Sequence, residues 1–209
     1  MIKVDYLQAR DYIANGNSGK IVLGLDRVRK LCEFLGNPQD KVKLIHISGT
    51  NGKGSVGTFI ASVLTASGYK VGRYTSPEVL NYRDKFSING QWISEDEFAS
   101  LTDVISRFVD KMPDRPTPFE IETALAYYYF EQNDCDFAVV ECGMGGKEDA
   151  TNVADNKVLS VLTSVALDHT QFLGDTLEKI TEQKIGIVKG SPLVSAGQCS
   201  EVLAVLKDK

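Results

Sequence analysis

The chain has 209 residues, of which 43% are hydrophobic and 24% are charged, and its net charge is −5. This composition excludes an intrinsically disordered chain, and the acidic balance excludes a surface that attracts nucleic acid or an anionic membrane. The length suits one sizeable domain, or one domain with part of a second.

The cysteine pattern and the N-terminal sequence bear on the compartment. No two cysteines form a CxxC pair, and the N-terminal segment lacks a signal-peptide pattern. No apolar run reaches the roughly 18 residues that are needed to span a bilayer. We therefore expect a cytoplasmic protein with buried free thiols, at Cys32, Cys135, Cys142 and Cys199.

The beginning of the chain predicts two helices. Residues 3–14 carry apolar residues loosely on one side, and residues 25–35 follow a 3–4 spacing. The composition of residues 15–19 is typical of a loop, and Gly36-Asn37-Pro38 ends the second helix.

A β-loop-α-β unit follows. Residues 42–48 read as a strand, and a glycine-rich loop comes directly after it. Apolar residues from Val56 to Leu64 then predict a helix that ends near Gly68, and residues 70–74 predict a second strand. The connection between two such strands is right-handed, so we expect them to be parallel.

The middle of the chain predicts a hairpin and a capped helix. Residues 85–93 suit a strand or hairpin with a turn at Asn89-Gly90. Ser94 followed by Glu97 has the spacing of a capping box, which opens a helix to about Val109.

The remaining elements continue the alternation of helices and strands, without a linker or an internal repeat. Strands alternating with helices predict an α/β fold, with a mostly parallel sheet and helices on both faces. The expected elements are a loop at 112–118, an aromatic-rich helix at 119–130, strands at 137–140, 158–165 and 193–195, and helices at 176–188 and 199–207.

The glycine-rich loop predicts a phosphate site. Gly49–Ser55 follows a strand and opens a helix, where unpaired backbone N–H groups and the helix dipole attract anions. Glycines let the backbone approach phosphate oxygens, Lys53 adds positive charge, and the Ser55 hydroxyl can bind Mg²⁺. A turn that only caps a helix is the alternative. The residues expected to bind ATP are Gly49, Thr50, Asn51, Gly52, Lys53, Gly54, Ser55 and Val56.

The stretch from His46 to Val56 resembles the ATP loop of folylpolyglutamate synthase and of its relative dihydrofolate synthase, members of the Mur ligase superfamily. The Lys-Gly-Ser order at 53–55 is typical of the folate enzymes, whereas the cell-wall ligases usually carry Lys-Thr. The resemblance covers nearly the whole chain, through matches at 25–38, 74–77, 119–124, 141–152, 167–174 and 184–187. It implies a fold similar to a P-loop NTPase and to the Mur ligase central domain.

Four positions depart from the family pattern, at Glu78, Tyr82–Phe86, Lys147-Glu148 and Ile185. Glu78 and Tyr82–Phe86 lie on the side of the site expected for the acid substrate, so these departures leave the identity of that acid open. Glu78 would add negative charge where an anionic substrate passes.

The resemblance implies enzymes that are much longer than this chain. Residues 1–209 are accordingly expected to be an ATP-binding domain truncated at its C-terminal end, without the glutamate-ligase domain that would follow. The fragment alone is expected to bind nucleotide and to be inactive.

The family reaction is the ATP-dependent ligation of L-glutamate to the carboxylate of a folate or dihydropteroate through an acyl phosphate. The partners implied are ATP, that acid and glutamate, with Mg²⁺ at two sites, no nucleic acid, no membrane and a monomeric chain. A Mur-type ligase acting on another acid and a catalytically silent nucleotide-binding module remain alternatives.

Glu141 is the first candidate metal ligand. It ends an apolar strand, where a carboxylate enters the ligand crevice of a parallel sheet. Together with Ser55 it would offer the oxygen ligands that Mg²⁺ prefers. A strand-end glutamate that pairs with a lysine is the alternative.

His169 and Lys184 take their roles from the resemblance. It implies that His169 helps to hold a second Mg²⁺ and that Lys184 becomes a carbamate that binds metal, and with Lys53 these are the expected catalytic residues. The alternatives are an orienting or core histidine and a solvated lysine. His46 lies inside a strand, so we interpret it as structural.

The acid substrate is expected at Thr75, Ser76 and Pro77, which the resemblance places on the folate side. Asp149 and Asn152 are expected to shape the acid or metal region. The aromatic run 127–130 lies on one continuous helix, and we interpret it as core and not as a platform for stacking.

Overall fold

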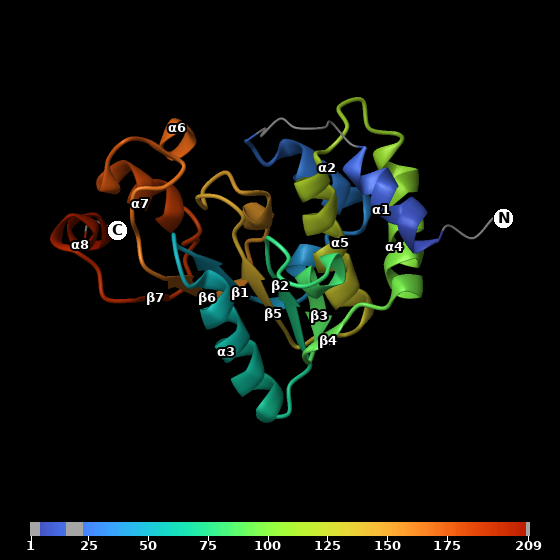
Figure 1. The fold of residues 1–209 in the computed structure, drawn as a ribbon, viewed down its shortest axis with the longest axis horizontal. Coiled ribbons are helices and arrows are strands. Elements are labelled where there is room, and N and C mark those ends of the chain that lie inside the picture. Colours follow the sequence, from blue (N-terminus) through green and yellow to red (C-terminus); the bar gives the residue numbers. More distant parts are fainter. Residues whose placement is uncertain (1–4, 16–22, 208–209) are drawn as a thin grey trace.

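The computed structural model describes residues 5–15 and 23–207. Residues 3–4 of the first predicted helix and residues 16–19 of the predicted loop lie outside this part. The described residues form an α/β fold around a seven-stranded sheet with the order β4-β3-β2-β5-β1-β6-β7 (Figure 1).

Five neighbouring strands of the sheet, from β2 to β7, are parallel, and the β3–β4 hairpin adds an antiparallel edge. The hairpin turn at Asn89-Gly90 is confirmed, with both residues at positive φ. The strands are β1 (Lys43–Ser48), β2 (Val71–Tyr74), β3 (Phe86–Ile88), β4 (Gln91–Trp92), β5 (Phe137–Glu141), β6 (Lys157–Leu162) and β7 (Leu193–Ser195).

Helices cover both faces of the sheet, as predicted (Figure 1). One face carries α1 (Tyr6–Ala14), α2 (Asp26–Phe34), α4 (Glu95–Val109) and α5 (Pro118–Gln132), and the other carries α3 (Lys53–Ala66). Beside β6 and β7 lie α6 (Thr170–Leu173), α7 (Leu177–Ile185) and α8 (Ser200–Lys207). Short 3-10 turns occupy Pro38–Asp40, Tyr82–Lys85 and Ala150–Val153.

The alternation of side chains along the central strands divides the core in two. On β1, Leu44 packs toward α2 and α5, whereas Ile45 and Ile47 pack toward α3. On β5, Val140 likewise packs toward α2 and α5, whereas Val139 packs toward α3. Because side chains of a strand point alternately to opposite faces, these near-continuous apolar runs are what a sheet buried on both faces requires.

Helix α5 is buried along most of its length. Thr117 and Glu120 cap its N-terminus reciprocally, and Pro118 stands at the first helical position, both of which favour a helix start. The aromatic run on α5 belongs to the core, as predicted: Tyr127 and Phe130 are both at most 1% exposed.

Three local predictions need correction. The capping box at Ser94 is only half formed, because the Glu97 carboxylate accepts a hydrogen bond from Asn133 instead. The strand predicted to Val165 ends at Leu162, because Ser164 pairs with Asn51 of the glycine-rich loop Gly49–Ser55, called the phosphate loop from here on. Short helices such as α6 were not predicted, since they are too brief to show a period.

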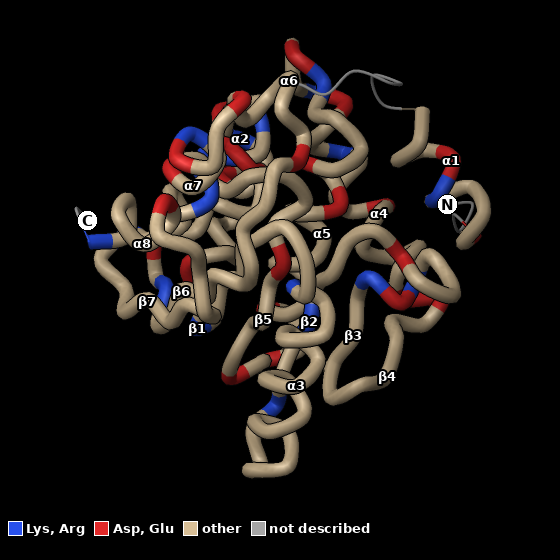
Figure 2. Tube along the Cα trace, turned by 60° about the vertical axis from the view of Figure 1, so that its left-hand side comes forward, with Lys and Arg blue, Asp and Glu red and all other residues tan. Residues whose placement is uncertain are grey.

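The distribution of charge follows the composition. Acidic and basic positions are interspersed along the trace (Figure 2), and Lys53 is the only charged residue of α3. Within the described residues, no helix combines the length and the apolar character needed to cross a membrane.

The central strand provides a test of this packing. Ile47→Ala should lower the free energy of unfolding by about 2–5 kcal/mol, because Ile47 is fully buried between β1 and α3 and the truncation leaves a cavity. Chemical denaturation checks the value. Val194→Ala on β7, where the side chain is 55% exposed, is the matched control and should change stability little; equal losses in both variants would contradict the two-sided core.

Candidate functional site

The phosphate loop begins with a close approach between two backbone segments. Gly49 has φ +143°, and a Cβ there would collide with the Thr163 hydroxyl and lie 3.1 Å from the Thr163 nitrogen. Only glycine fits this position without displacing the end of β6. The close approach therefore sets the position of the loop relative to the sheet.

Hydrogen bonds then hold the loop against the segment after β6. The Thr50 N–H donates to the Ser164 carbonyl at 2.7 Å. The Thr50 hydroxyl donates to the Ala166 carbonyl at 3.2 Å and accepts from the Ala166 N–H at 3.1 Å. These bonds hold residues 49–51 against the segment after β6.

The phosphate loop leads directly into helix α3, and no side chain accepts a hydrogen bond from the backbone N–H groups at the start of that helix. Gly52 precedes the helix with φ +86°, and no side chain caps this terminus. The Lys53 ammonium donates to the carbonyls of Gly49 and Thr50, each at 3.2 Å, and lies 3.9 Å from Glu141 Oε1. Ser55 is exposed. Uncapped N–H groups and a nearby ammonium are the components of an anion site.

Glu141 lies at the carboxyl end of β5, facing the start of α3. It is 7% exposed and accepts a short hydrogen bond from the Thr75 hydroxyl. Burial raises the pKa of Glu141 above its ordinary value, while Thr75 and Lys53 oppose that rise. A Cβ on Gly54 would lie 3.4 Å from Glu141 Oε2, so the carboxylate and the loop are immediate neighbours.

The possible metal ligands in this region suit Mg²⁺, which keeps water and phosphate ligands, better than a metal ion that is bound by protein side chains alone. Glu141 and Ser55 offer oxygen ligands, and Mg²⁺ is usually held by one or two carboxylates together with water and phosphate. Across residues 5–15 and 23–207, no three His, Cys, Asp or Glu side chains cluster as a metal site would require. His169 is exposed at φ +47°, and its ring lies 3.6 Å from Asp168.

Lys184 lies beneath the phosphate loop and not in solvent. Its side chain is fully buried, and its ammonium donates to the Gly49 carbonyl at 2.8 Å. Burial, and to a smaller extent the charge of Lys53, lower the pKa of Lys184 to about 8. Two amines therefore share one carbonyl of the loop.

Asp149 organises the loop that follows β5. Its carboxylate accepts hydrogen bonds from the Met144 N–H at 2.7 Å and from the Thr151 N–H at 3.0 Å, and burial raises its pKa. Asn152 donates to the carbonyls of Lys147 and Gly186 and accepts from Lys157. Both side chains thus fix the segment that faces α7.

His46 occupies a structural position inside β1. The imidazole is fully buried, 2.8 Å from the Thr151 hydroxyl and 3.2 Å from the Cys142 sulfur. Burial lowers the pKa of His46 well below its ordinary value. The ring is neutral at pH 7 and joins β1 to the loop after β5.

The segment after β2 carries the residues expected on the acid side. The Ser76–Pro77 peptide is cis, and the buried Ser76 hydroxyl has no hydrogen-bond partner in the part of the chain that the structure describes. Further along, the Asp84 carboxylate accepts the N–H groups of residues 79–81 at 2.6–3.1 Å. This single carboxylate fixes the loop, although Val79 and Leu80 are 82% and 81% exposed.

Glu78 forms an ion pair with Lys85, an ammonium that it shares with Glu122. Lys85 lies 3.2 Å from Glu78 and 3.0 Å from Glu122, and Tyr82 donates to Glu122 at 2.7 Å. A backbone hydrogen bond has the largest effect in lowering the pKa of Glu78, and the Lys85 ammonium lowers it as well. Two of the positions that depart from the family pattern, Glu78 and Lys85, therefore form an ion pair.

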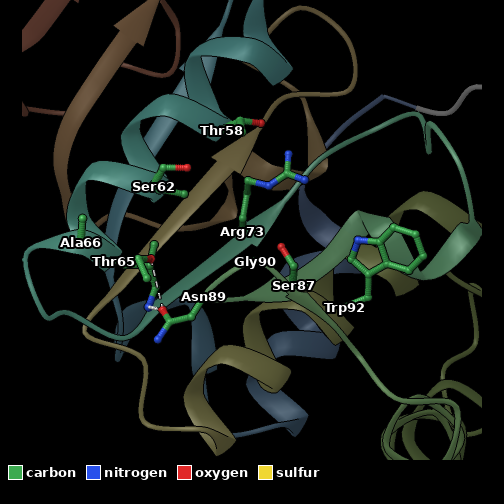
Figure 3. Close-up of a pocket in the computed structure, with 11 residues that line it drawn as sticks. Thr58, Ser62, Thr65, Ala66, Arg73, Ser87, Asn89, Gly90 and Trp92 are labelled. Carbon is green, nitrogen blue, oxygen red and sulfur yellow. Dashed lines mark hydrogen bonds between the residues drawn. The ribbon is translucent and has the colours of Figure 1, made fainter.

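Two adjoining cavities lie between α3 and the strands β2–β4. The inner cavity, of about 450 Å³, is bounded by Gly52, Gly54 and Ser55 of the phosphate loop and by the segment 75–84. The outer cavity, of about 460 Å³, runs along α3 (Figure 3). Arg73 and Trp92 line both cavities.

Sequence reasoning missed Arg73 and Trp92. The available signal was an arginine between Gly72 and Tyr74 in an otherwise buried strand, where a cation is unexpected. Thr163, which receives Gly49, was also missed, because contacts between distant segments leave no local pattern.

The sequence model of the Mur ligase middle domain matches residues 47–200 of the chain. The chain is 39% identical over 208 residues to the dihydrofolate synthase/folylpolyglutamate synthase of Bacillus subtilis (strain 168), which covers 97% of this chain and 48% of the relative. It is 40% identical over 189 residues to the folylpolyglutamate synthase of Lacticaseibacillus casei, with 88% and 44% covered.

Solved structures show the same fold. The apo form of L. casei FPGS matches with a TM-score of 0.93 and 37% identity, covering 98% of this chain and 51% of that one. An FPGS–AMPPCP–folate complex matches with a TM-score of 0.93 and 38% identity over the same shares. The chain spans about half the length of the curated relatives it matches.

The buried position of Lys184 predicts a pH dependence of stability. Its folded pKa of about 8 lies below the ordinary 10.5, so between these values the unfolded chain binds more protons. The free energy of unfolding should therefore rise with pH through this window. Denaturation across the window should show the rise in the wild type and a flatter profile in Lys184→Met.

Lys41→Met is the control, because Lys41 is an exposed lysine that pairs with Glu131. This variant should retain the rise of the wild type. A profile for Lys184→Met that is as steep as that of the wild type would show that Lys184 does not carry the effect.

Proposed function

The chain belongs to the Mur ligase family, whose middle domain it matches over residues 47–200, and on this premise we propose that it binds Mg-ATP for the ligation of L-glutamate to a folate-type acid. Residues 1–209 are proposed as the ATP-binding domain of that ligase. The observation that carries the proposal is the geometry of the phosphate loop, with uncapped donors at α3 and the ammonium of Lys53 between the loop and Glu141.

The loop residues would bind the nucleotide phosphates through their backbone. Gly49–Ser55 presents N–H groups at the start of α3, where the helix dipole favours negative charge. Lys53 now donates to two loop carbonyls, and these neutral acceptors leave its charge available to a phosphate. Val56 continues the helix behind the loop.

Magnesium would be held by Ser55 and Glu141, with His169 and Lys184 proposed at a second position. The ion supplies positive charge that offsets the phosphates during transfer. The hydrogen bond from Thr75 keeps the Glu141 carboxylate turned toward the loop. His169 lies on the segment after β6, which hydrogen bonds to the loop at Thr50.

The acid would enter through the inner cavity, which Thr75 lines and which Ser76 and Pro77 follow in the chain. Asp149 and Asn152 would hold the neighbouring loop in shape. In the reaction, a carboxylate oxygen bonds to the γ-phosphorus and ADP leaves. The amine of glutamate then bonds to the acyl carbon, loses a proton, and phosphate leaves.

The implied partners are small molecules: ATP, a folate or dihydropteroate, and L-glutamate. We propose a monomer and a cytoplasmic location. The described cysteines are all free, and three of them are buried, which supports a reducing compartment.

Nucleotide binding tests the proposal directly. Calorimetric titration of Mg-ATP into the chain should show binding, and Lys53→Ala should weaken it about 10- to 100-fold, because a charge-assisted hydrogen bond to phosphate is lost. Lys30→Ala, which removes an exposed lysine paired with Glu33 on α2, should leave the affinity unchanged. Equal affinity in the Lys53 variant and the wild type would refute nucleotide binding at this loop.

Carbamylation of Lys184 forms a second part of the proposal. Only a neutral amine adds CO₂, and a pKa of about 8 gives Lys184 a larger neutral fraction near pH 7 than an exposed lysine has. The product would be an anion beside Lys53, where the structure now places two amines on one carbonyl. Addition of CO₂ would therefore replace a repulsive pair with an attractive one.

A carbon-13 NMR spectrum of the chain in labelled bicarbonate tests this modification. The wild type should show one slowly exchanging carbamate signal that Mg-ATP strengthens, and Lys184→Arg should lack it. Lys189→Arg, on the segment after α7, should keep the signal. A wild-type spectrum without any carbamate signal would exclude the modification in this chain.

A further inference from the structure

The chain contains three Asn-Gly steps, at residues 15–16, 51–52 and 89–90. In such a step the glycine nitrogen can attack the side-chain amide carbon of the asparagine, because glycine has no Cβ to obstruct the approach. Two of the steps, Asn51-Gly52 and Asn89-Gly90, lie wholly within the described residues. Their surroundings differ, so we expect their reactivities to differ as well.

Asn89 is held at both its side chain and its backbone. The Val71 N–H donates to Asn89 Oδ1 at 2.8 Å, and the Thr65 hydroxyl donates to the same oxygen at 3.3 Å (Figure 3). The Asn89 N–H in turn donates to the Val71 carbonyl at 2.9 Å. The side-chain amide therefore cannot turn toward the Gly90 nitrogen until hydrogen bonds break.

Asn51 has no such restraint on its side chain. The residue is exposed, and its side-chain amide makes no hydrogen bond with residues 5–15 or 23–207. Its backbone pairs with Ser164, whose hydroxyl donates to the Asn51 carbonyl at 3.3 Å. Neither contact involves the side-chain amide, which is therefore free to rotate.

Gly52 is accessible as the attacking group. It has φ +86°, and a Cβ built on it would meet no atom within 4 Å. No side chain caps this end of α3, and the Gly52 N–H donates to no backbone carbonyl of the described residues. An attack by this nitrogen therefore gives up no existing hydrogen bond.

We propose that Asn51-Gly52 is a site of spontaneous deamidation that inactivates the phosphate loop. The Gly52 nitrogen bonds to Asn51 Cγ and loses its proton, and the side-chain nitrogen leaves as ammonia. Water then opens the resulting succinimide at either of its two carbonyls, which leaves aspartate or isoaspartate at position 51. Solvent water is the only co-reactant, and nothing is oxidised or reduced.

Either product places a carboxylate two positions before Lys53. The Lys53 ammonium now donates only to the neutral carbonyls of Gly49 and Thr50, so a new anion beside it would compete with phosphate for its charge. This consequence rests on the proposed function, since it takes the loop to bind phosphate.

Isoaspartate also changes the path of the backbone, because it inserts a methylene group into the main chain. The insertion falls between Thr50, which is bonded to Ser164 and Ala166, and the start of α3. Both ends of this short segment are fixed, so the extra atom displaces the N–H groups that would surround an anion.

Ageing of the intact chain tests the site independently of the function. The chain is incubated at mildly alkaline pH, which promotes loss of the glycine proton, in oxygen-18 water, which labels each new carboxylate. Peptide-mapping mass spectrometry follows each Asn-Gly step separately. Conversion at Asn51 should be at least about tenfold faster than at Asn89, whose hydrogen bonds must break first. An equal or slower rate at Asn51 overturns the proposal.

Thr65→Val is the matched variant, because it removes one of the two donors to Asn89 Oδ1 and lies outside the phosphate loop. The rate at Asn89 should rise about two- to fivefold, whereas the rate at Asn51 should stay the same. Thermal melting verifies that the variant is folded. An unchanged rate at Asn89 would overturn the assignment of the difference between the two steps to hydrogen bonds.

Calorimetric titration with Mg-ATP tests the inactivation. Wild type and Asn51→Gln are aged in parallel, since the longer glutamine side chain forms the cyclic intermediate far more slowly. The number of binding sites in the aged wild type should fall in proportion to the fraction converted at Asn51. Aged Asn51→Gln should bind like its own fresh form. Full binding by wild type that has been converted at Asn51 overturns the inactivation.

The two measurements separate the deamidation site from the proposed function. If fresh wild type binds no Mg-ATP, the proposed function and the inactivation fail together, while the rates at Asn51 and Asn89 still decide the deamidation site. If Mg-ATP binds and Asn51 is stable during ageing, the proposed function stands and the deamidation site is overturned.

Discussion

The contact of Gly49 with Thr163 fixes the relation between the phosphate loop and the sheet, and the rest of the site depends on it. With residue 49 held against the end of β6, Thr50 can bond to Ser164 and Ala166. The next residues must then turn into α3, which places Lys53 beside the end of β5. The close approach at Gly49 and the bonds of Thr50 thus bring the ends of β1 and β6 together, and Lys53 links them to the end of β5.

Where these strand ends meet, basic side chains outnumber acidic ones. Lys53 and Lys184 both donate to the Gly49 carbonyl, while the nearest carboxylate, Glu141, lies 3.9 Å from Lys53. The surplus of positive charge suits a protein whose net charge is −5 and whose surface does not attract anions. The proposed attraction for phosphate is therefore local and rests mainly on Lys53, because burial lowers the pKa of Lys184 and reduces the positive charge that it contributes.

The sequence predicted the fold class and the succession of helices and strands along the chain, including the glycine-rich loop between β1 and α3, whose binding of phosphate stays a prediction. These features follow from local period and composition. The limits are equally physical. The strand predicted to Val165 ends at Leu162 because residues 163–166 bond to a loop more than a hundred positions away. The pairing of Glu78 with Lys85 and the position of Arg73 opposite Ser87 arise from register, which no single segment of the sequence encodes.

The hydrogen bonds from residues 79–81 to Asp84 have a consequence for the entropy of binding. Ordering one residue of a flexible loop costs about 1–2 kcal/mol. Here that ordering occurs on folding, so Val79 and Leu80 are presented to solvent in a fixed arrangement. Whatever covers these two side chains gains the burial of apolar surface without an additional loss of loop freedom, and one carboxylate thereby converts an exposed turn into a pre-organised apolar contact.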